Sequence, residues 1–390
     1  MKKIKLLLLG LLVSTYFSSC SKDENFDVIN FQISSDTNFV DNREAIAIAT
    51  MFEFPIDNTK SSTRSTSTYL EVDNITPIGN EKKPSFYIVN YKNNSGFSII
   101  AGDKRADPVL AFSTEGNFNL DLKNMPTGLI EWLDNTDAYI SEIRITNQRI
   151  NQIEDQQIPQ EIDPCNDEVI RVGPLLKTEW GQYNGYNNRV PKTGCDKTWY
   201  NPEGKAPAGC VAVATAQVMG YHKYPKSFNW SVMPDTYGSD ETAILMRDLG
   251  IYLKIDYKCD GSSAYVSDIP KTLKSLGYNS AKHKSYGTSD YHLVINQIDA
   301  KSPVILGGAT DSVWGTIGIY PNGHAWVCDG YSRHKSCNPN GGFSSALFFH
   351  MNWGWDNGLY NGWFDHGNWA PERNNNGYNN RTEIVYDIKP

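Results

Sequence analysis

The alternation of apolar and polar residues along the chain predicts two folded units with a polar stretch between them. The first unit, residues 30–146, has apolar positions at helical spacing and short apolar runs bounded by turn residues. Its expected elements are a helix at 41–52, strands at 85–90, 96–101 and 109–112, and a helix at 129–143. We therefore expect a small α+β domain.

The stretch from 147 to 169 interrupts this pattern. It is rich in Gln, Asn and charged residues and has no aromatic residue. Such a composition is typical of an exposed linker that proteases reach easily. We expect the chain to be cut here.

The second unit, residues 170–390, places helices before strands. The expected helices begin at 210, lie within 228–257 and cover 270–277, and the expected strands are 304–306, 325–329, 346–351 and 362–364. This order also predicts an α+β arrangement.

The N-terminus has the pattern of an export signal. Two lysines precede the apolar run 4–13, which is too short to span a bilayer. The run ends in Phe17-Ser18-Ser19-Cys20, which resembles a bacterial lipobox, with cleavage before Cys20 and acylation of its thiol. We expect a signal peptide at 1–19 and a polar tether at 20–29 that resembles the leaders of outer-membrane lipoproteins in the Bacteroides group. Ordinary secretory cleavage is the alternative.

Composition narrows the possible partners. The chain is 39% hydrophobic and 12% aromatic, which is enough for sizeable cores, and its formal net charge is −8. Without a basic stripe, binding of nucleic acid through its phosphates is not expected. The only membrane contact that we expect is the lipid on Cys20 of a cell-surface protein.

Cys210 is the first candidate for chemistry. It follows the turn Pro207-Ala208-Gly209 and opens an apolar, alanine-rich helix. The partial positive charge and free N–H groups of a helix start favour a thiolate over a thiol. Taken alone, however, a cysteine in an apolar helix is more often buried and inert, so the assignment depends on a partner base.

His324 is the best candidate for that base among the seven histidines. Gly323 precedes it, and a predicted strand begins directly after it. A histidine at the first position of a strand is held rigidly and is accessible from a cleft, as a general base must be.

Two amide side chains complete a candidate catalytic set. Asn352 can accept a hydrogen bond from one imidazole N–H of His324 and so fix the tautomer that faces the thiol. Trp353 next to it can shield that bond from water. The Gln182 amide and the backbone N–H of Cys210 can together form an oxyanion hole.

The chain resembles the streptopain-type cysteine peptidases, peptidase family C10. The residues that carry the resemblance are AGCVAVATAQVMGYHKYP at 208–225, GHAWVCDGY at 323–331, NWGW at 352–355, TEWGQ at 178–182 and GFSIIAGDKR at 96–105. The first segment is long and specific, and the last lies in the part that matches the family's inhibitory propeptide.

The resemblance implies a zymogen with a papain-like catalytic domain, in which Cys210 is the nucleophile and His324 the base. It also implies that residues 30–146 form an intramolecular inhibitor, that Gly323 lines the substrate cleft and that Ser262 contacts substrate. No cofactor or metal is implied. The chain departs from the family in the loop at 185–187, which reads Gly-Tyr-Asn where Pro-Tyr-Asn is expected, and in having several cysteines.

Five cysteines remain once Cys20 and Cys210 are set aside, so at most two disulfides can form among them. They are Cys165, Cys195, Cys259, Cys328 and Cys337. A Cys328–Cys337 disulfide would close a hairpin loop, and the pattern is otherwise open. A zinc site at Cys328, His334 and Cys337 would lack a fourth ligand and the usual spacing.

The sequence thus predicts a surface cysteine endopeptidase made as a zymogen, which acts on proteins or peptides. A transglutaminase-like acyl transferase is the nearest enzymatic alternative, because it uses the same Cys–His chemistry with an amine acceptor. The alternative from another class is an adhesin-like lipoprotein on a peptidase fold.

Overall fold

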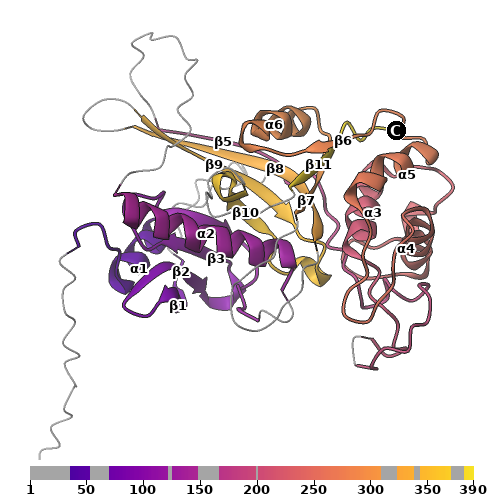
Figure 1. Ribbon diagram of the computed structural model, residues 1–390, viewed down its shortest axis with the longest axis horizontal. Helices are drawn as coiled ribbons and strands as arrows, with labels where there is room; N and C mark the ends of the chain where they lie inside the picture. Colours follow the sequence, from indigo (N-terminus) through magenta and orange to yellow (C-terminus); the bar gives the residue numbers. More distant parts are fainter. Residues whose placement is uncertain are drawn as a thin grey trace, which may run out of the picture. The chain divides into compact units, whose positions relative to one another are not determined.

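The computed structural model places the expected elements on one antiparallel sheet with helices on both sides (Figure 1). The structure describes residues 36–52, 70–121, 125–147, 167–198, 201–308, 323–337, 343–369 and 382–390. The predicted signal peptide, Cys20, the tether and residues 148–166 of the predicted linker lie outside this part. Within it, no helix combines the length and apolarity that a membrane crossing requires.

The N-terminal half contains the predicted helices and strands and one further strand. Its elements are α1 (Asn42–Met51), β1 (Val72–Asn80), β2 (Lys83–Tyr91), η1 (Lys92–Asn94), β3 (Phe97–Ala101), β4 (Val109–Ser113) and α2 (Thr127–Thr146). Asp41 caps α1 by accepting from the N–H groups of Arg43 and Glu44. The sequence pattern missed β1, because only Ile78 of that strand is buried and its polar residues face solvent.

The C-terminal half contains four helices and seven strands among the described residues. The helices are α3 (Cys210–His222), α4 (Asp240–Tyr252), α5 (Ile269–Ser275) and α6 (Tyr291–Asp299). The strands are β5 (Glu168–Val172), β6 (Lys282–Ser285), β7 (Val304–Gly308), β8 (His324–Cys337), β9 (Phe343–Asn352), β10 (Gly362–Asp365) and β11 (Glu383–Tyr386). Short 3-10 helices connect them at η3 (Trp230–Val232), η4 (Val266–Asp268), η5 (Thr288–Asp290), η6 (Asp356–Gly358) and η7 (His366–Trp369).

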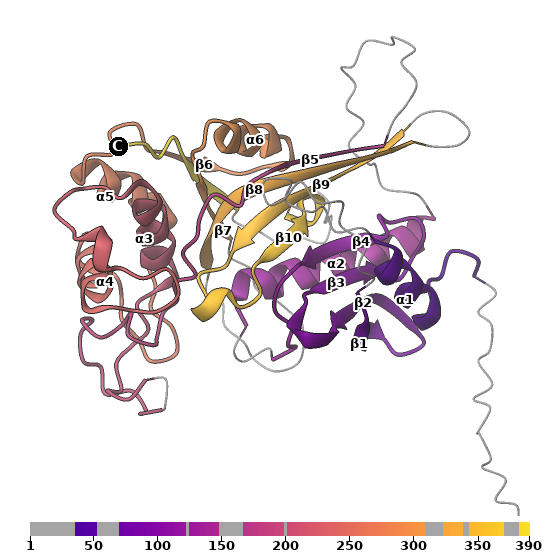
Figure 2. The ribbon, with the colours of Figure 1, turned by 180° about the vertical axis from the view of Figure 1, so that it is seen from behind.

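A single sheet runs through both halves in the order β1-β2-β3-β4-β10-β9-β8-β7-β11-β6, and β5 pairs with β8 (Figure 2). The two halves meet where β4 pairs with β10, with Phe112 opposite Trp363 and Ala111 opposite Phe364. The N-terminal half is therefore attached to the C-terminal half by backbone hydrogen bonds as well as by side chains.

The register of β7, β8 and β9 fixes the positions of the candidate residues. His324 begins β8 opposite Gly308 of β7, and Asn352 ends β9 opposite Val327 of β8. The β8–β9 register shifts between Cys328 and Gly330, so Asp329 is an extra residue, as in a β-bulge.

Helix α3 is buried on all sides over its first ten residues, Cys210–Met219. It packs between the sheet at β7 and β8 and the helix α4. An alanine-rich, mostly apolar sequence suits such a position, because small side chains let neighbouring elements approach closely.

One expectation about the cysteines is wrong. Cys328 is a free, buried thiol, so it forms no disulfide with Cys337. Both residues lie on β8, and a strand rises about 3.3 Å per residue, which separates them far beyond disulfide reach. Among the described residues, a disulfide joins Cys195 to Cys259, while Cys165 lies outside them.

Candidate active site

Cys210 is the first residue of α3 and is only 8% exposed. The helix is capped by Gly209, whose φ of 95° is unfavourable for residues with a side chain. A Cβ at Gly209 would also lie 3.1 Å from Cδ1 of Ile255 and 3.4 Å from the carbonyl of Ser262. Glycine is therefore required next to the nucleophile for both its conformation and its size.

Backbone N–H groups surround the Cys210 sulfur. The backbone N–H groups of Ala325, Val211 and Cys210 lie near the sulfur and favour the thiolate by lowering its pKa. The contact with Ala325 places the sulfur beside the start of β8, where His324 is the preceding residue. Burial is the larger effect, however, and it raises the pKa of the Cys210 thiol.

His324 lies inside a cage of tryptophans and is 4% exposed. Its ring centroid is 5.9 Å from that of Trp326, 5.6 Å from Trp355 and 6.5 Å from Trp353. Its Nε2 donates to the Trp353 carbonyl at 2.9 Å, since a carbonyl can only accept. Burial lowers the pKa of His324 to about 4.

The pKa shifts of Cys210 and His324 both favour the neutral form of the side chain. A raised thiol pKa and a lowered imidazole pKa keep both Cys210 and His324 neutral near pH 7. An active cysteine peptidase needs the reverse, a thiolate beside an imidazolium. Burial therefore favours the neutral forms of both Cys210 and His324 in this structure.

Gln182 lies beside the nucleophile turn. Its backbone carbonyl accepts from the N–H of Ala208 at 3.0 Å, two residues before Cys210. The half-buried carboxylate of Asp356 lies beside this segment and accepts from Nδ2 of Asn184. Burial raises its pKa, and the N–H groups of Tyr183 and Gln182 oppose that rise. We did not anticipate Asp356, because an aspartate in a Gly- and Asn-rich loop carries no signal of its own.

Asn352 is close to the pair but does not contact His324 in this structure. Its Oδ1 accepts from Nε2 of Gln217 at 2.9 Å and from the N–H of Gly354 at 3.2 Å, and its Nδ2 donates to the Thr178 carbonyl at 2.7 Å. The ring nitrogen that we expected it to hold is bonded to the adjacent Trp353 carbonyl instead. Trp353 is fully buried against His324, where a shield was expected.

The two predicted substrate residues lie on either side of the pair. Gly323 is exposed immediately before His324. Ser262 is 7% exposed, and its Cβ lies 3.5 Å from the position of a Cβ on Gly209. The Ser262 hydroxyl is buried and has no hydrogen-bond partner among the described residues, so the structure does not show it exposed to a substrate.

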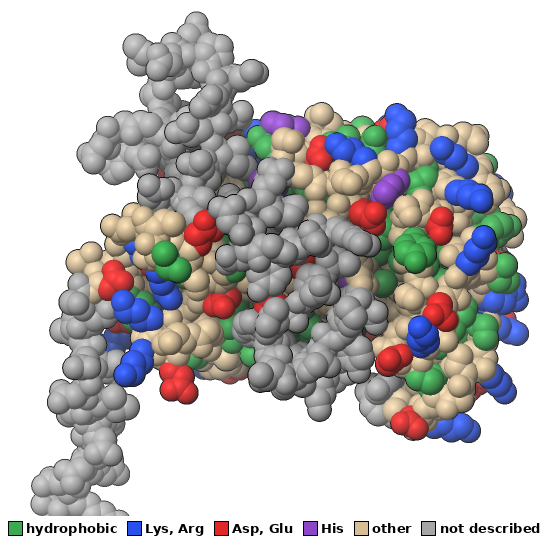
Figure 3. All heavy atoms as spheres, viewed as in Figure 1, with side chains coloured by type: hydrophobic (Ala, Val, Ile, Leu, Met, Phe, Trp, Pro, Cys, Tyr) green, Lys and Arg blue, Asp and Glu red, His purple; other side chains and the backbone are tan. Residues whose placement is uncertain are grey.

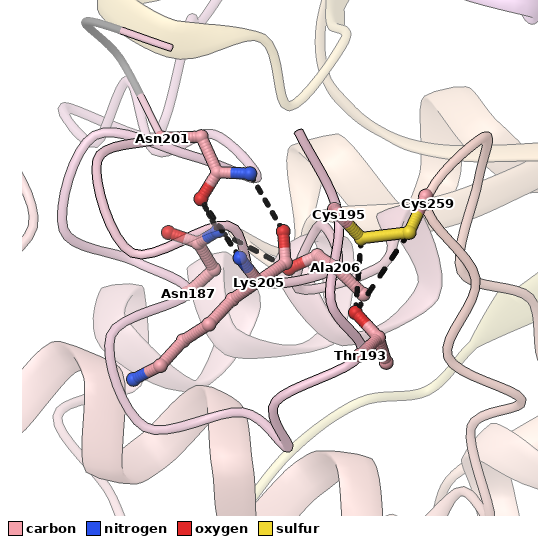
Figure 4. The surroundings of a disulfide bond; sticks show 7 residues. All are labelled: Asn187, Thr193, Cys195, Asn201, Lys205, Ala206 and Cys259. Carbon is pink, nitrogen blue, oxygen red and sulfur yellow. Dashed lines mark hydrogen bonds between the residues drawn. A yellow bond between two sulfur atoms is a disulfide. The ribbon is translucent and has the colours of Figure 1, made fainter. Parts of the chain in front are cut away.

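A disulfide fixes the loop that carries Ser262 (Figure 4). Asp256 and Ser263 exchange backbone hydrogen bonds of 2.9 and 3.1 Å, which close a small loop with Cys259 inside it. The bond from Cys259 to Cys195 ties this loop to the segment that leads into α3.

That leading segment is folded by two asparagines (Figure 4). Asn201 donates to the Lys205 carbonyl at 2.7 Å and accepts from its N–H at 3.2 Å. Asn187 donates to the Ala206 carbonyl at 3.1 Å. The approach to the nucleophile turn is thus fixed by side-chain bonds as well as by the disulfide.

Helix α2 of the N-terminal half packs directly on the tryptophan cage. A Cβ at Gly128 would lie 2.8 Å from the Trp326 ring and 3.2 Å from the Trp353 ring. Trp132 of the same helix donates from Nε1 to the Asp365 carbonyl of β10 at 3.2 Å. The absence of a side chain at Gly128 therefore lets α2 pack against Trp326 and Trp353, two of the rings that surround His324.

Glu131 of α2 is buried in this contact at 2% exposure. Its Oε2 would lie 2.7 Å from a Cβ on Gly308, which is the strand partner of His324. Its Oε1 has no hydrogen-bond partner among the described residues. Burial, with a smaller contribution from Asp134, raises the pKa of Glu131 to about 8.

Comparison with known families finds two matches along the chain. Residues 180–231 and 226–364 match the Peptidase C10 family, and residues 37–140 match the Spi protease inhibitor. Streptopain of Streptococcus pyogenes is 26% identical over 386 residues, which cover 85% of this chain and 86% of streptopain.

Two further proteins are similar over most of this chain. The thiol protease/hemagglutinin PrtT of Porphyromonas gingivalis is 25% identical over 84% of this chain and 39% of its own length. A solved fragment of prointerpain A from Prevotella intermedia has a TM-score of 0.58 at 24% identity, covering 81% of this chain and 99% of the fragment. At that identity the structural likeness supports the fold alone.

Proposed function

Since the chain belongs to the Peptidase C10 family and carries a Spi protease inhibitor domain ahead of its catalytic part, we propose that Cys210 and His324 cleave peptide bonds only after that domain is displaced. The chain is a cysteine endopeptidase with its own inhibitor domain. Proteins or peptides are its substrates, and the inhibitor domain is its intramolecular partner.

The reaction that this site supports is acyl transfer to water. His324 takes the proton of the Cys210 thiol, the resulting thiolate attacks the scissile carbonyl carbon, and His324 then gives the proton to the leaving amine as the peptide C–N bond breaks. Water hydrolyses the resulting thioester. The Cys210 N–H and the Gln182 side-chain amide stabilise the oxyanion, while Asn352 and Trp353 support His324 and the groups at Gly323 and Ser262 contact the substrate.

The packing of α2 on the tryptophan cage is the observation that carries the proposal. Gly128 and Glu131 contact the residues that surround His324, and the pair beneath them is un-ionised. Departure of α2 would expose this surface to water and lower the desolvation that opposes both charges.

Labelling with E-64 tests this latency. We expect intact-mass spectrometry to show one adduct on Cys210 in the matured protein and labelling at least about tenfold slower in the full-length chain, because only the thiolate reacts well. Equal rates in the two forms would show that the inhibitor domain does not restrain the thiol. No adduct on the matured form would instead contradict the cysteine-peptidase function.

The same proposal includes export and a lipid anchor at Cys20. The lysines, the short apolar run and the residues before Cys20 support it. A Cys20→Ala variant is expected to move from the membrane fraction to the soluble fraction of the cell envelope, measured by blotting of fractionated cells. Retention of the variant with the membrane at the level of the parent would argue against acylation.

Acidic and basic side chains are interspersed on the visible face of the C-terminal half (Figure 3). Lys271, Lys274 and Lys282 line one pocket of this half together with His283.

A further inference from the structure

Gln217 is a polar residue in the otherwise apolar buried face of α3. It is fully buried and follows Cys210 by about two helical turns, so the two residues lie on the same side of the helix. A buried amide is unfavourable unless its donor and acceptor are both satisfied, and here both are.

The side chain of Gln217 joins two segments that are far apart in the sequence. Its Oε1 accepts from Oγ1 of Thr178 at 2.9 Å and from the N–H of Trp180 at 3.2 Å. Its Nε2 donates to Oδ1 of Asn352 at 2.9 Å. Asn352 closes the ring by donating to the Thr178 carbonyl at 2.7 Å.

Each group in this ring is connected to a different part of the active site. The segment from Thr178 continues to Gln182, whose carbonyl binds the N–H of Ala208 before the nucleophile. Asn352 precedes Trp353, whose carbonyl holds Nε2 of His324. Helix α3 itself begins at Cys210.

We propose that Gln217 is a positioning residue that sets the relative placement of the Cys210 helix, the Gln182 segment and the His324 support. This inference rests on the proposed peptidase function. Only an uncharged amide fills the position, because a donor must face Asn352 while an acceptor faces Thr178 and Trp180. Glutamate keeps the shape but loses the donor when ionised, and methionine keeps the length but loses both.

The test compares Gln217→Glu and Gln217→Met with Thr215→Val in the matured enzyme. Thr215 is a matched control, because it is buried on the same helix and its Oγ1 bonds only within the helix, to the Val211 carbonyl at 2.7 Å. Active sites are counted by E-64 titration, so that kcat is expressed for each competent thiol. Misfolded molecules then do not lower the measured value.

We expect both Gln217 variants to lose about 10–100-fold in kcat at pH 8 with KM changed less than about threefold, since a misplacement near 1 Å costs about 10²-fold. Thr215→Val is expected to stay within about threefold of the parent. The loss in Gln217→Glu should shrink as pH falls, because the protonated carboxyl regains a donor, whereas the loss in Gln217→Met should not change with pH.

Three outcomes would overturn the assignment. The first is an unchanged kcat per titrated site in both Gln217 variants, and the second is a loss of kcat in them no larger than that of Thr215→Val. The third is failure of both Gln217 variants to fold when Thr215→Val folds. The last result would make Gln217 a residue of the core rather than of the site. Absence of E-64 titration in the parent would contradict the peptidase function itself, which separates the two failures.

Discussion

A Cys210→Ala protein is expected to lose at least about 10⁴-fold in kcat/KM for peptide hydrolysis and to remain at full length through purification. Removal of the nucleophile of a catalytic pair has costs of this order, and without the thiolate no acyl-enzyme forms. Hydrolysis of a fluorogenic peptide gives the first value, and intact-mass spectrometry gives the second.

The chain contains its own control for this experiment. Cys328 is the other buried free thiol among the described residues, and burial raises its pKa well above the usual value. A Cys328→Ala variant should keep activity within a few fold of the parent and should mature normally. Unaided cleavage of the Cys210→Ala chain between 147 and 169 would mean that the molecule does not process itself.

Replacing Glu131 with glutamine is expected to remove most of the pH dependence of the contact between the inhibitor domain and the catalytic domain. The pKa of this carboxyl is about 8 in the folded chain, compared with about 4.3 for an unperturbed glutamate. The stabilising contribution of the Glu131 carboxyl is therefore complete below about pH 4.3 and is lost as pH rises to about 8. Between these two pKa values the free energy of unfolding falls by about 1.4 kcal/mol per pH unit.

Thermal unfolding between pH 4.5 and 8.5 measures this effect. Cys210→Ala should be the background, so that the chain stays intact. The midpoint should fall with rising pH in the parent and much less in Glu131→Gln, and the two curves should cross or converge toward acid pH. Glu142→Gln on the same helix is the matched control and should follow the parent. Parallel curves for the parent and Glu131→Gln would contradict the role of this carboxyl.

The fold was predictable where hydrophobic spacing was clear. Helix α3 and strands β3, β4 and β7 are largely or wholly buried, so their apolar runs identify them. Strand β6 was missed because its sequence is Lys-His-Lys-Ser and none of its residues is buried. It forms a strand because it pairs with β11. This contact is distant in the sequence, so the local spacing of hydrophobic residues does not predict it.

Local sequence patterns select the candidate residues of the site but do not predict their contacts. Cys210 and His324 were identified from a helix start and a strand start, which are local features. The partners of Asn352 depend on where β9 ends relative to α3 and the Thr178 segment, and no local pattern encodes that. Gln217 did carry a signal, because a glutamine within an apolar, buried helix must find partners.

The disulfide pairing could not be predicted from the sequence for a different reason. Cys195 and Cys259 are separated by 64 positions, and several pairings of the available cysteines were equally consistent with the sequence. Only the fold brings the two sulfur atoms together.

The pairing of β4 with β10 changes what activation must involve. Backbone hydrogen bonds hold the inhibitor domain to the sheet, and a cut between 147 and 169 breaks none of them. After the cut, β4 of the inhibitor domain still pairs with β10. When this domain dissociates, β10 (Gly362–Asp365) becomes an unpaired edge strand of the sheet. Under the proposed function, maturation therefore requires two events, cleavage of the chain and removal or digestion of the detached piece.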